Sequence, residues 1–240
     1  MEKMSGLIYE GGEKQIFAAD DPSLVMIRYT DDTSAYKGFK KGVIPGKGKV
    51  NNMINSSIFM MLEENGIRTH FVRRLNERDS LNRRVEIIPV NIIVRNAAAG
   101  SLLQRLGLTE GAALACPVIE YCYKSDALSD PMINRTHVDA LGLATKEELD
   151  FIEETSLRVN ELLKAFFEKI GVLLIDFRME FGRCDGGIVL ADEISPDTCR
   201  LWDSRTGEKL DKDRFRRDLG DVENAYQEIL RRMEQGGLIR

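Results

Sequence analysis

One short segment carries three charged residues at alternate positions. Residues 174–182 read LIDFRMEFG, a pattern typical of a β-strand. Because successive side chains of a strand point to opposite faces, Asp176, Arg178 and Glu180 share one face. Three charges on one face of an apolar strand are costly if they are simply buried. They are therefore either solvated or line a cleft that holds a cation and an anionic ligand, and this strand alone leaves both interpretations open.

A second group of charged residues follows on the expected partner strand. Residues 190–203 read LADEISPDTCRLWD and bring Asp192, Glu193, Asp197 and Arg200 close together in sequence. Carboxylate oxygens suit Mg²⁺, which keeps several waters and shares the phosphates of a nucleotide. Two carboxylates that face each other across a hairpin can form such a site. The alternative is a surface loop with unpaired acids.

The register of this hairpin decides whether Glu180 and Asp192 share a face, because a slip of one residue turns every side chain over. A two-residue turn at 185–186 pairs Glu180 with Ala191 and sends Asp192 to the apolar face. A three-residue loop over 185–187 has the glycines that a left-handed position needs, and it keeps both carboxylates in the cleft. We therefore predict the odd-numbered loop, although a bulge can also restore the parity.

Three glycine-containing segments are candidates for anion binding. Residues 94–101, VRNAAAGS, lead from a strand to a helix start, where Arg95 and Ser101 can meet a phosphate. The alternative is an ordinary strand–helix junction with Ser101 as its cap. Residues 9–14, YEGGEK, form a glycine turn with Lys14 beyond it, which is either a cover for nucleotide phosphates or a plain hairpin. Residues 45–49, PGKGK, lack the spacing of a phosphate-binding P-loop.

The elements that position these residues indicate an α+β fold. Strand-like segments come first, and longer amphipathic helices dominate the later part of the chain. A capping box at Thr145 and Glu148 predicts the clearest helix. Strands are predicted at 7–17, 23–30, 69–73, 85–95, 172–181 and 188–193, and helices at 51–65 (with Asn51 or Asn52 as the cap), 102–106, 145–170 and 221–233.

Composition narrows the functional class. The chain has 240 residues, a formal net charge of −5 and four cysteines without a CxxC pair. We expect free thiols and no structural zinc site. The acidic balance argues against nucleic acid as a partner. No run of 18 apolar residues and no signal-peptide core is present, so we expect a cytoplasmic protein without membrane contact.

Taken together, these segments resemble the SAICAR synthetase (phosphoribosylaminoimidazole-succinocarboxamide synthase) family over residues 7–232. The two stretches LIDFRMEFG and DEISPDTCRLWD resemble the signature sequences of that family. Further matches in order and spacing are DDTSAYKG (31–38), GKGKVNN (46–52), VRNAAAGSL (94–102), YKSDALSDP (123–131) and LDKDRFRRDLG (210–220).

The resemblance implies a fold and a reaction. The fold is a two-lobed, ATP-grasp-like arrangement of antiparallel sheets and packed helices with an inter-lobe nucleotide cleft. We expect a mainly β lobe at 1–88 that covers ATP, and an α+β lobe at 89–240 with the metal and substrate sites. The reaction joins carboxyaminoimidazole ribonucleotide to L-aspartate with ATP and Mg²⁺, through an acyl phosphate. Relatives also suggest a homodimer.

Site roles carry over by matching position. Glu180 and Asp192 are the implied Mg²⁺ ligands that also hold ATP, with Asp176 and Arg178 beside them in the catalytic group. The backbone at 86–88, which includes Glu86 and Ile88, is expected to meet the adenine. The remaining implied residues are Lys14 and Lys124 for the ATP phosphates, Arg95, Ser101 and Arg200 for the ribonucleotide phosphate, Lys212 and Arg216 for substrate, and Asp130 for the amine donor.

Three departures from the family pattern bear on this assignment. Gly11-Gly12-Glu13-Lys14 stands where GKAK is common, so one phosphate-facing lysine is missing at position 12. Arg178 replaces a usual lysine and changes the geometry of the charge, and Lys37 stands where some relatives carry an acid. Two alternatives therefore stay open: another ATP-dependent carboxylate–amine ligase with a different acceptor, and a nucleotide-binding protein that has lost catalysis.

Overall fold

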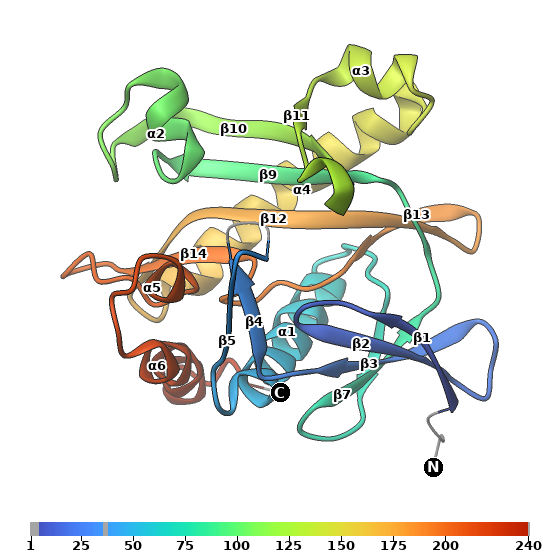
Figure 1. Cartoon of the computed structure of the whole chain (residues 1–240), viewed down its shortest axis with the longest axis horizontal. Coiled ribbons are helices and arrows are strands. Elements are labelled where there is room, and N and C mark those ends of the chain that lie inside the picture. The colour runs from blue at the N-terminus through green and yellow to red at the C-terminus, as the bar shows by residue number, and fades with distance from the viewer. Residues whose placement is uncertain (1–4, 36–37, 240) are drawn as a thin grey trace.

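The structure is a computed structural model that describes residues 5–35 and 38–239, so Lys37 lies outside the described residues. Two antiparallel sheets dominate it (Figure 1). The first has five strands in the order β1-β2-β3-β7-β6. Its strands are β1 (Ser5–Glu10), β2 (Lys14–Ala18), β3 (Leu24–Tyr29), β6 (Phe71–Arg74) and β7 (Asp79–Arg83). The strand segment predicted at 7–17, with Gly11-Gly12 as its break, is a hairpin that turns at these two glycines.

A short hairpin and a long helix follow the third strand. The hairpin joins β4 (Asp32–Ala35) to β5 (Lys40–Val43), and the helix is α1 (Lys47–Glu64). The predicted cap at Asn51 or Asn52 is wrong, since α1 begins several residues earlier and both asparagines are buried inside it. The carboxylate of Asp31 accepts hydrogen bonds from the Gly46 and Gly48 N–H groups at 3.1 and 3.0 Å. The helix start is thus satisfied by a residue distant in sequence.

The second sheet has seven strands, of which β12 is the longest. The order β11-β10-β9-β12-β13 forms the main path, and β8 and β14 also pair with β12. The predicted strand at 85–95 is divided into two strands, which are separated around Pro89. The strands are β8 (Glu86–Ile87), β9 (Val90–Ala97), β10 (Ala113–Tyr123), β11 (Met132–Ile133), β12 (Val172–Cys184), β13 (Gly187–Ala191) and β14 (Cys199–Asp203).

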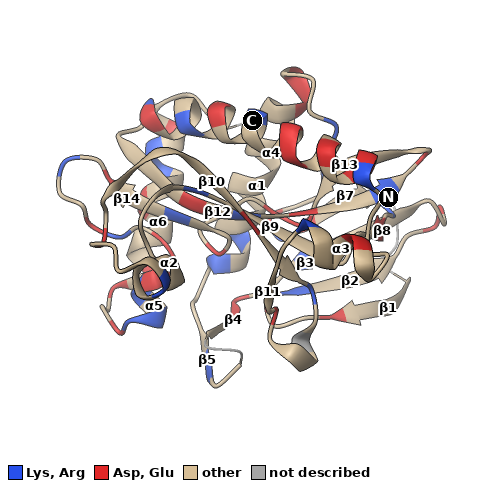
Figure 2. Ribbon diagram, turned by 90° about the horizontal axis from the view of Figure 1, so that it is seen from above, with Lys and Arg blue, Asp and Glu red and all other residues tan. Residues whose placement is uncertain are grey.

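Helices pack around this sheet. Helix α4 (Lys146–Glu168) lies against β9 and β12, and Figure 2 shows acidic and basic residues distributed along it. Its predicted capping box is confirmed, because Thr145 Oγ1 accepts from the Glu148 N–H at 3.2 Å and Glu148 Oε2 accepts from the Thr145 N–H at 2.8 Å. The other helices are α2 (Ser101–Leu106), α3 (Arg135–Ala140), α5 (Asp213–Arg216) and α6 (Val222–Gln235), with a 3₁₀ turn at Asp126–Leu128.

One large apolar core joins the two predicted lobes. It includes side chains from the N-terminal helix α1, from β12 and from the two C-terminal helices α4 and α6, among them Ile54, Ile58, Phe59, Val159, Leu163, Phe177, Phe181 and Ile229. The segment before β6 also touches the second sheet, where Thr69 forms a parallel bridge with Leu190. These contacts confirm the α+β class. Within the described ranges, no helix is long and apolar enough to cross a membrane.

The β12–β13 hairpin differs from the predicted register. Cys184 pairs with Gly187 and Glu180 with Ala191, so the turn has two residues and the predicted odd-numbered loop is wrong. Asp192 nevertheless reaches the same cavity as Glu180. The physical reason is that Asp192 lies just beyond β13 and adopts a left-handed backbone with φ of 61°. Strand alternation ends at Ala191 and no longer decides where the Asp192 side chain points.

Candidate active site

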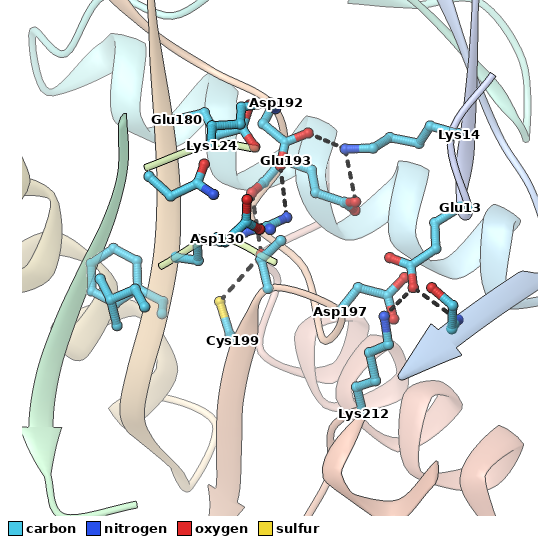
Figure 3. A pocket seen from close by; sticks show the side chains of 18 of the residues that line it. Glu13, Lys14, Lys124, Asp130, Glu180, Asp192, Glu193, Asp197, Cys199 and Lys212 are labelled. Carbon is cyan, nitrogen blue, oxygen red and sulfur yellow. Dashed lines mark hydrogen bonds and ion pairs between the residues drawn. The ribbon is translucent and has the colours of Figure 1, made fainter. Parts of the chain in front are cut away.

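A cavity of about 880 Å³ lies where the glycine turn of the first sheet meets the second sheet. The wall from the first sheet includes Glu13 and Lys14 at the start of β2. The opposite wall comes from β9, β12 and the segments that follow β10 and β13 (Figure 3). Charged residues from both predicted lobes therefore face one space.

The charged face of β12 lines this cavity. Asp176, Arg178 and Glu180 are all lining residues, whereas Met179 and Phe181 are buried in the apolar core on the other face. The alternation predicted from LIDFRMEFG is therefore confirmed. Of the two interpretations, the cleft is the one that the structure shows, and Asp176 and Glu180 are almost fully buried.

An alternating chain of arginines and carboxylates forms one wall. In order of contact its members are Arg105, Glu120, Arg95, Asp176, Arg200, Asp213 and Arg216. Asp176 accepts from Arg95 Nη1 at 2.5 Å and from Arg200 Nη1 at 2.8 Å. Asp213 accepts from Arg200 Nε at 2.8 Å and from Arg216 Nη1 at 2.6 Å. Each inner carboxylate thus holds two guanidinium groups, which fixes their planes.

The structure brings Arg95, Ser101 and Arg200 together around Asp176. Arg95 Nη2 donates to Ser101 Oγ at 3.5 Å. Gly100 has φ of 57°, and a Cβ there would lie 2.7 Å from Nη2 of Arg200, so glycine leaves the room that this arginine occupies. Their contact with a phosphate stays a prediction. Asp176 pairs with both arginines and orients them, and its place beside the metal ligands stays a prediction.

The opposite side of the cavity is built from lysine–carboxylate pairs. Lys14 Nζ forms ion pairs with Asp192 and, at 3.0 Å, with Glu193 Oε1. Lys124 pairs with Glu180 (Figure 3). Burial lowers the pKa of Lys14, but the neighbouring carboxylates outweigh that effect and hold it above its ordinary value. Burial also opposes ionisation of Asp192, yet Lys14 and Arg178 keep the pKa of its carboxyl well below the usual range.

A second group of carboxylates combines two acids of the candidate segment 190–203, Glu193 and Asp197, with Glu13, which was not predicted. One oxygen each of Glu13, Glu193 and Asp197 lies within 4.8 Å of the others. A lysine pairs with each acid: Lys14 with Glu193, Lys47 with Asp197 at 2.7 Å, and Lys212 with Glu13. Burial and the nearby Asp197 raise the pKa of Glu193 despite Lys14. This group is therefore neutralised by lysines within the protein.

His70 contacts the backbone of Asp192 from outside the cavity lining. The two ring planes of His70 and Phe59 meet at 64° with centroids 5.7 Å apart. His70 Nε2 lies 3.1 Å from the backbone oxygen of Asp192, so its N–H donates in the neutral tautomer. Burial lowers the pKa of His70 to about 4. No local pattern predicts this contact, because it joins positions 122 residues apart.

Of the other predicted residues, some line the cavity and some do not. Asp130, Lys212 and Arg216 line the cavity, and Ser125 N–H donates to Asp130 Oδ1 at 2.8 Å. Of the described residues at 86–88, only Ile87 lines it. Glu86 pairs with Arg183 at 3.1 Å, and Ile88 is buried. A contact of their backbone with adenine stays a prediction.

Comparison with known proteins shows the relationship of the chain. A family model described as SAICAR synthetase matches residues 7–233. A phosphoribosylaminoimidazole-succinocarboxamide synthase of Clostridium botulinum (strain Alaska E43 / Type E3) is 56% identical over 98% of this chain and 100% of the relative. The crystal structure of the synthase from Ehrlichia chaffeensis superposes with a TM-score of 0.94 at 40% identity, covering 95% of this chain and 98% of that one. A SAICAR synthetase solved in complex with ADP gives a TM-score of 0.91 at 45% identity, covering 94% and 96%. On this evidence, the chain belongs to the SAICAR synthetase family.

Proposed function

We propose that the chain catalyses the ATP-dependent ligation of carboxyaminoimidazole ribonucleotide to L-aspartate, a step of purine biosynthesis. One observation carries this proposal beyond family membership. A single cavity combines a wall of oriented arginines, suited to a phosphate monoester, with a wall of lysines and carboxylates, suited to a nucleoside triphosphate and a divalent cation. A ligase with a non-nucleotide acceptor has no need of both walls.

The reaction proceeds in two steps that balance without a protein nucleophile. An oxygen of the imidazole carboxylate attacks the γ-phosphorus of ATP, and ADP leaves. The amine of aspartate then attacks the acyl carbon, loses a proton and expels phosphate. Cys199 also lines the cavity, but burial raises the pKa of its thiol far above the usual range, so it is no thiolate nucleophile. The site acts by positioning and by neutralising charge.

Each wall has a distinct task in this proposal. Arg95, Ser101 and Arg200 bind the ribonucleotide phosphate, and Arg216 and Lys212 add positive charge beside it. Lys14 and Lys124 bind the phosphates of ATP, and Asp130 lies near the amine donor. This placement rests on the lining of one cavity by all these side chains.

The residues present fit a magnesium ion. Glu180 and Asp192 are carboxylates on one cavity wall, within reach of two lysines that bind anions. Oxygen donors of this kind are those that Mg²⁺ takes in nucleotide sites. When bound, Mg²⁺ would neutralise charge on the transferred phosphate. Arg178 Nη2 lies 3.5 Å from Asp192 and helps to orient that carboxylate.

An assay with ATP, the imidazole carboxylate and aspartate tests the proposal. We expect formation of ADP and of the succinocarboxamide in equal amounts. Turnover only with another amine or carboxylate would favour a different ligase, and nucleotide binding without any turnover would favour a protein that has lost catalysis. Glu180→Gln is the control for contaminating activity.

The lobe boundary and the assembly belong to the same proposal. We place ATP between a lobe at 1–88 and a lobe at 89–240, in a cytoplasmic homodimer. The support is that the cavity takes lining residues from both ranges. Light scattering after size-exclusion chromatography measures the assembly, and a mass of one chain would exclude the dimer.

A further inference from the structure

The two proposed metal ligands are each held by a lysine that comes from a different element. Lys14, at the start of β2 in the first sheet, reaches Asp192 beyond the end of β13. Lys124, just after β10, reaches Glu180 on β12. Figure 3 shows the head of Lys14 directed toward Asp192 and Glu193. The lysines proposed to bind ATP are therefore the counter-ions of the carboxylates proposed to bind the metal.

Burial makes these counter-ions necessary. The side chains of Glu180 and Asp192 are 5% and 15% exposed. Removing one partner of a buried ion pair is strongly destabilising, because it leaves an uncompensated charge. Whatever displaces Lys14 or Lys124 must therefore supply a positive charge to the carboxylate and a negative charge to the lysine.

We propose that Lys14 and Lys124 act as built-in substitutes for the divalent cation. Cation and nucleotide then bind with positive coupling, because the cation replaces the lysines at the carboxylates while the nucleotide phosphates replace the carboxylates at the lysines. This inference rests on the proposed function, in which Glu180 and Asp192 hold the metal. A cation alone releases Lys124 from Glu180 with no anion to meet and leaves Lys14 with Glu193 only. A nucleotide alone takes the lysines, which leaves the buried Glu180 without its lysine and Asp192 with only Arg178 at 3.5 Å. Both together restore every pair.

The two lysines contribute unequally. Lys14 is 17% exposed and touches two carboxylates, since its Nζ also lies 3.0 Å from Glu193. Lys124 is 41% exposed, so water screens its pair more strongly. Loss of Lys14 therefore changes the coupling more than loss of Lys124.

The test measures Mn²⁺ binding to the full-length protein by electron paramagnetic resonance, without nucleotide and with ADP. We compare the unaltered protein with Lys14→Met, Lys124→Met and the control Lys49→Met. Lys49 pairs with Glu77 at 2.6 Å on the surface and lies outside the cavity lining. Circular dichroism verifies that each variant is folded.

The expected pattern is specific. ADP tightens Mn²⁺ binding to the unaltered protein and to Lys49→Met by roughly tenfold to a hundredfold, and Mn²⁺ tightens ADP binding by the same factor. Lys14→Met binds Mn²⁺ more tightly than the unaltered protein when nucleotide is absent, and the gain from ADP shrinks. Lys124→Met shows a smaller change in the same direction.

Two results would overturn the inference, and only the second would also contradict the proposed metal site. If Lys14→Met and Lys124→Met bind Mn²⁺ without nucleotide no better than Lys49→Met, the exchange is wrong while the metal site stands. If Glu180→Gln binds Mn²⁺ as well as the unaltered protein in the presence of ADP, the proposed metal site fails and the exchange fails with it.

Discussion

The two walls of the cavity hold their cations in different ways. On one wall Arg95 and Arg200 share carboxylates in an alternating chain, so that every inner member has two partners. On the other, Lys124 has the single carboxylate of Glu180, and Lys14 bridges from the first sheet to the second. A guanidinium has five N–H donors in a fixed plane, whereas an ammonium is a point charge on a flexible stem.

This difference separates two kinds of binding site. An arginine that keeps one carboxylate can still offer its remaining N–H groups to a phosphate, so the first wall is oriented before substrate arrives. A lysine with one counter-ion has to leave it to bind another anion, so under the proposed function the second wall rearranges when a nucleotide binds. The first wall therefore contributes orientation, and the second contributes coupling between ligands.

The largest expected effect comes from the carboxylates of the lysine wall. Glu180→Gln or Asp192→Asn should lower kcat by about a thousandfold with the fold intact, since each change removes charge without changing volume. Steady-state ADP release measures this loss, and circular dichroism measures the fold. Near-normal turnover in both variants would exclude them as metal ligands.

Arg200 tests the arginine wall. Arg200→Met removes the group that holds Asp176 and Asp213 together, and we expect the KM for the ribonucleotide to rise by about tenfold to a hundredfold. The KM for ATP should change far less, because Arg200 lies on the other wall. Arg231→Met, which loses a surface pair with Glu228 and lies outside the cavity lining, is a control. Equal increases for both substrates would contradict the division into two walls.

The support of Asp192 by His70 predicts a pH effect on stability. The folded-state pKa of His70 is about 4 against an ordinary value of 6.5. Between these values the unfolded chain binds the proton and the folded chain does not, so stability falls as pH drops from 6.5 to 4. The slope is up to about 1.4 kcal/mol per pH unit.

Urea unfolding of the unaltered protein and of His70→Gln between pH 7 and pH 4 measures this slope. Other titrating groups are common to both proteins, so the difference between the two free energies of unfolding isolates His70. A difference that does not change with pH would show that the folded protein also protonates His70.

The smallest effect concerns the lysine missing from the glycine turn. The described glycines with left-handed backbone do not include Gly12, and a Cβ there would lie 3.1 Å from Ser34 Oγ. A side chain is therefore tolerated after a shift of a few tenths of an ångström. Gly12→Lys should tighten ATP binding by roughly two- to fivefold, because the new charge is exposed. Gly12→Met is the uncharged control, and equal affinity in the two variants would show that position 12 does not face the nucleotide.

Local patterns predicted the features that depend on neighbouring residues. The alternating charges of β12 and the capping box of α4 follow from spacing alone, and the structure confirms both. The start of α1 could not be found in this way, because the carboxylate that caps it belongs to Asp31. The same holds for Glu120, which holds Arg95 from another strand.

The hairpin shows a subtler limit. Strict alternation requires an odd-numbered loop if Glu180 and Asp192 are to share one face. The side chains do share the cavity, but the backbone achieves this by leaving the strand at Ala191 rather than by lengthening the turn. Asp is one of the few residues that adopt left-handed backbone readily, a signal that alternation rules do not contain.

That left-handed backbone also limits which residues position 192 can accept during evolution. A replacement must satisfy two unrelated demands, a carboxylate for the proposed metal site and a φ of 61° for the chain. Asparagine meets the second demand and glutamate only the first, because a longer side chain loses the local hydrogen bonding that eases this conformation. The substitution that conserves charge is therefore the one that disturbs the backbone, and no single replacement gives a gradual path away from aspartate.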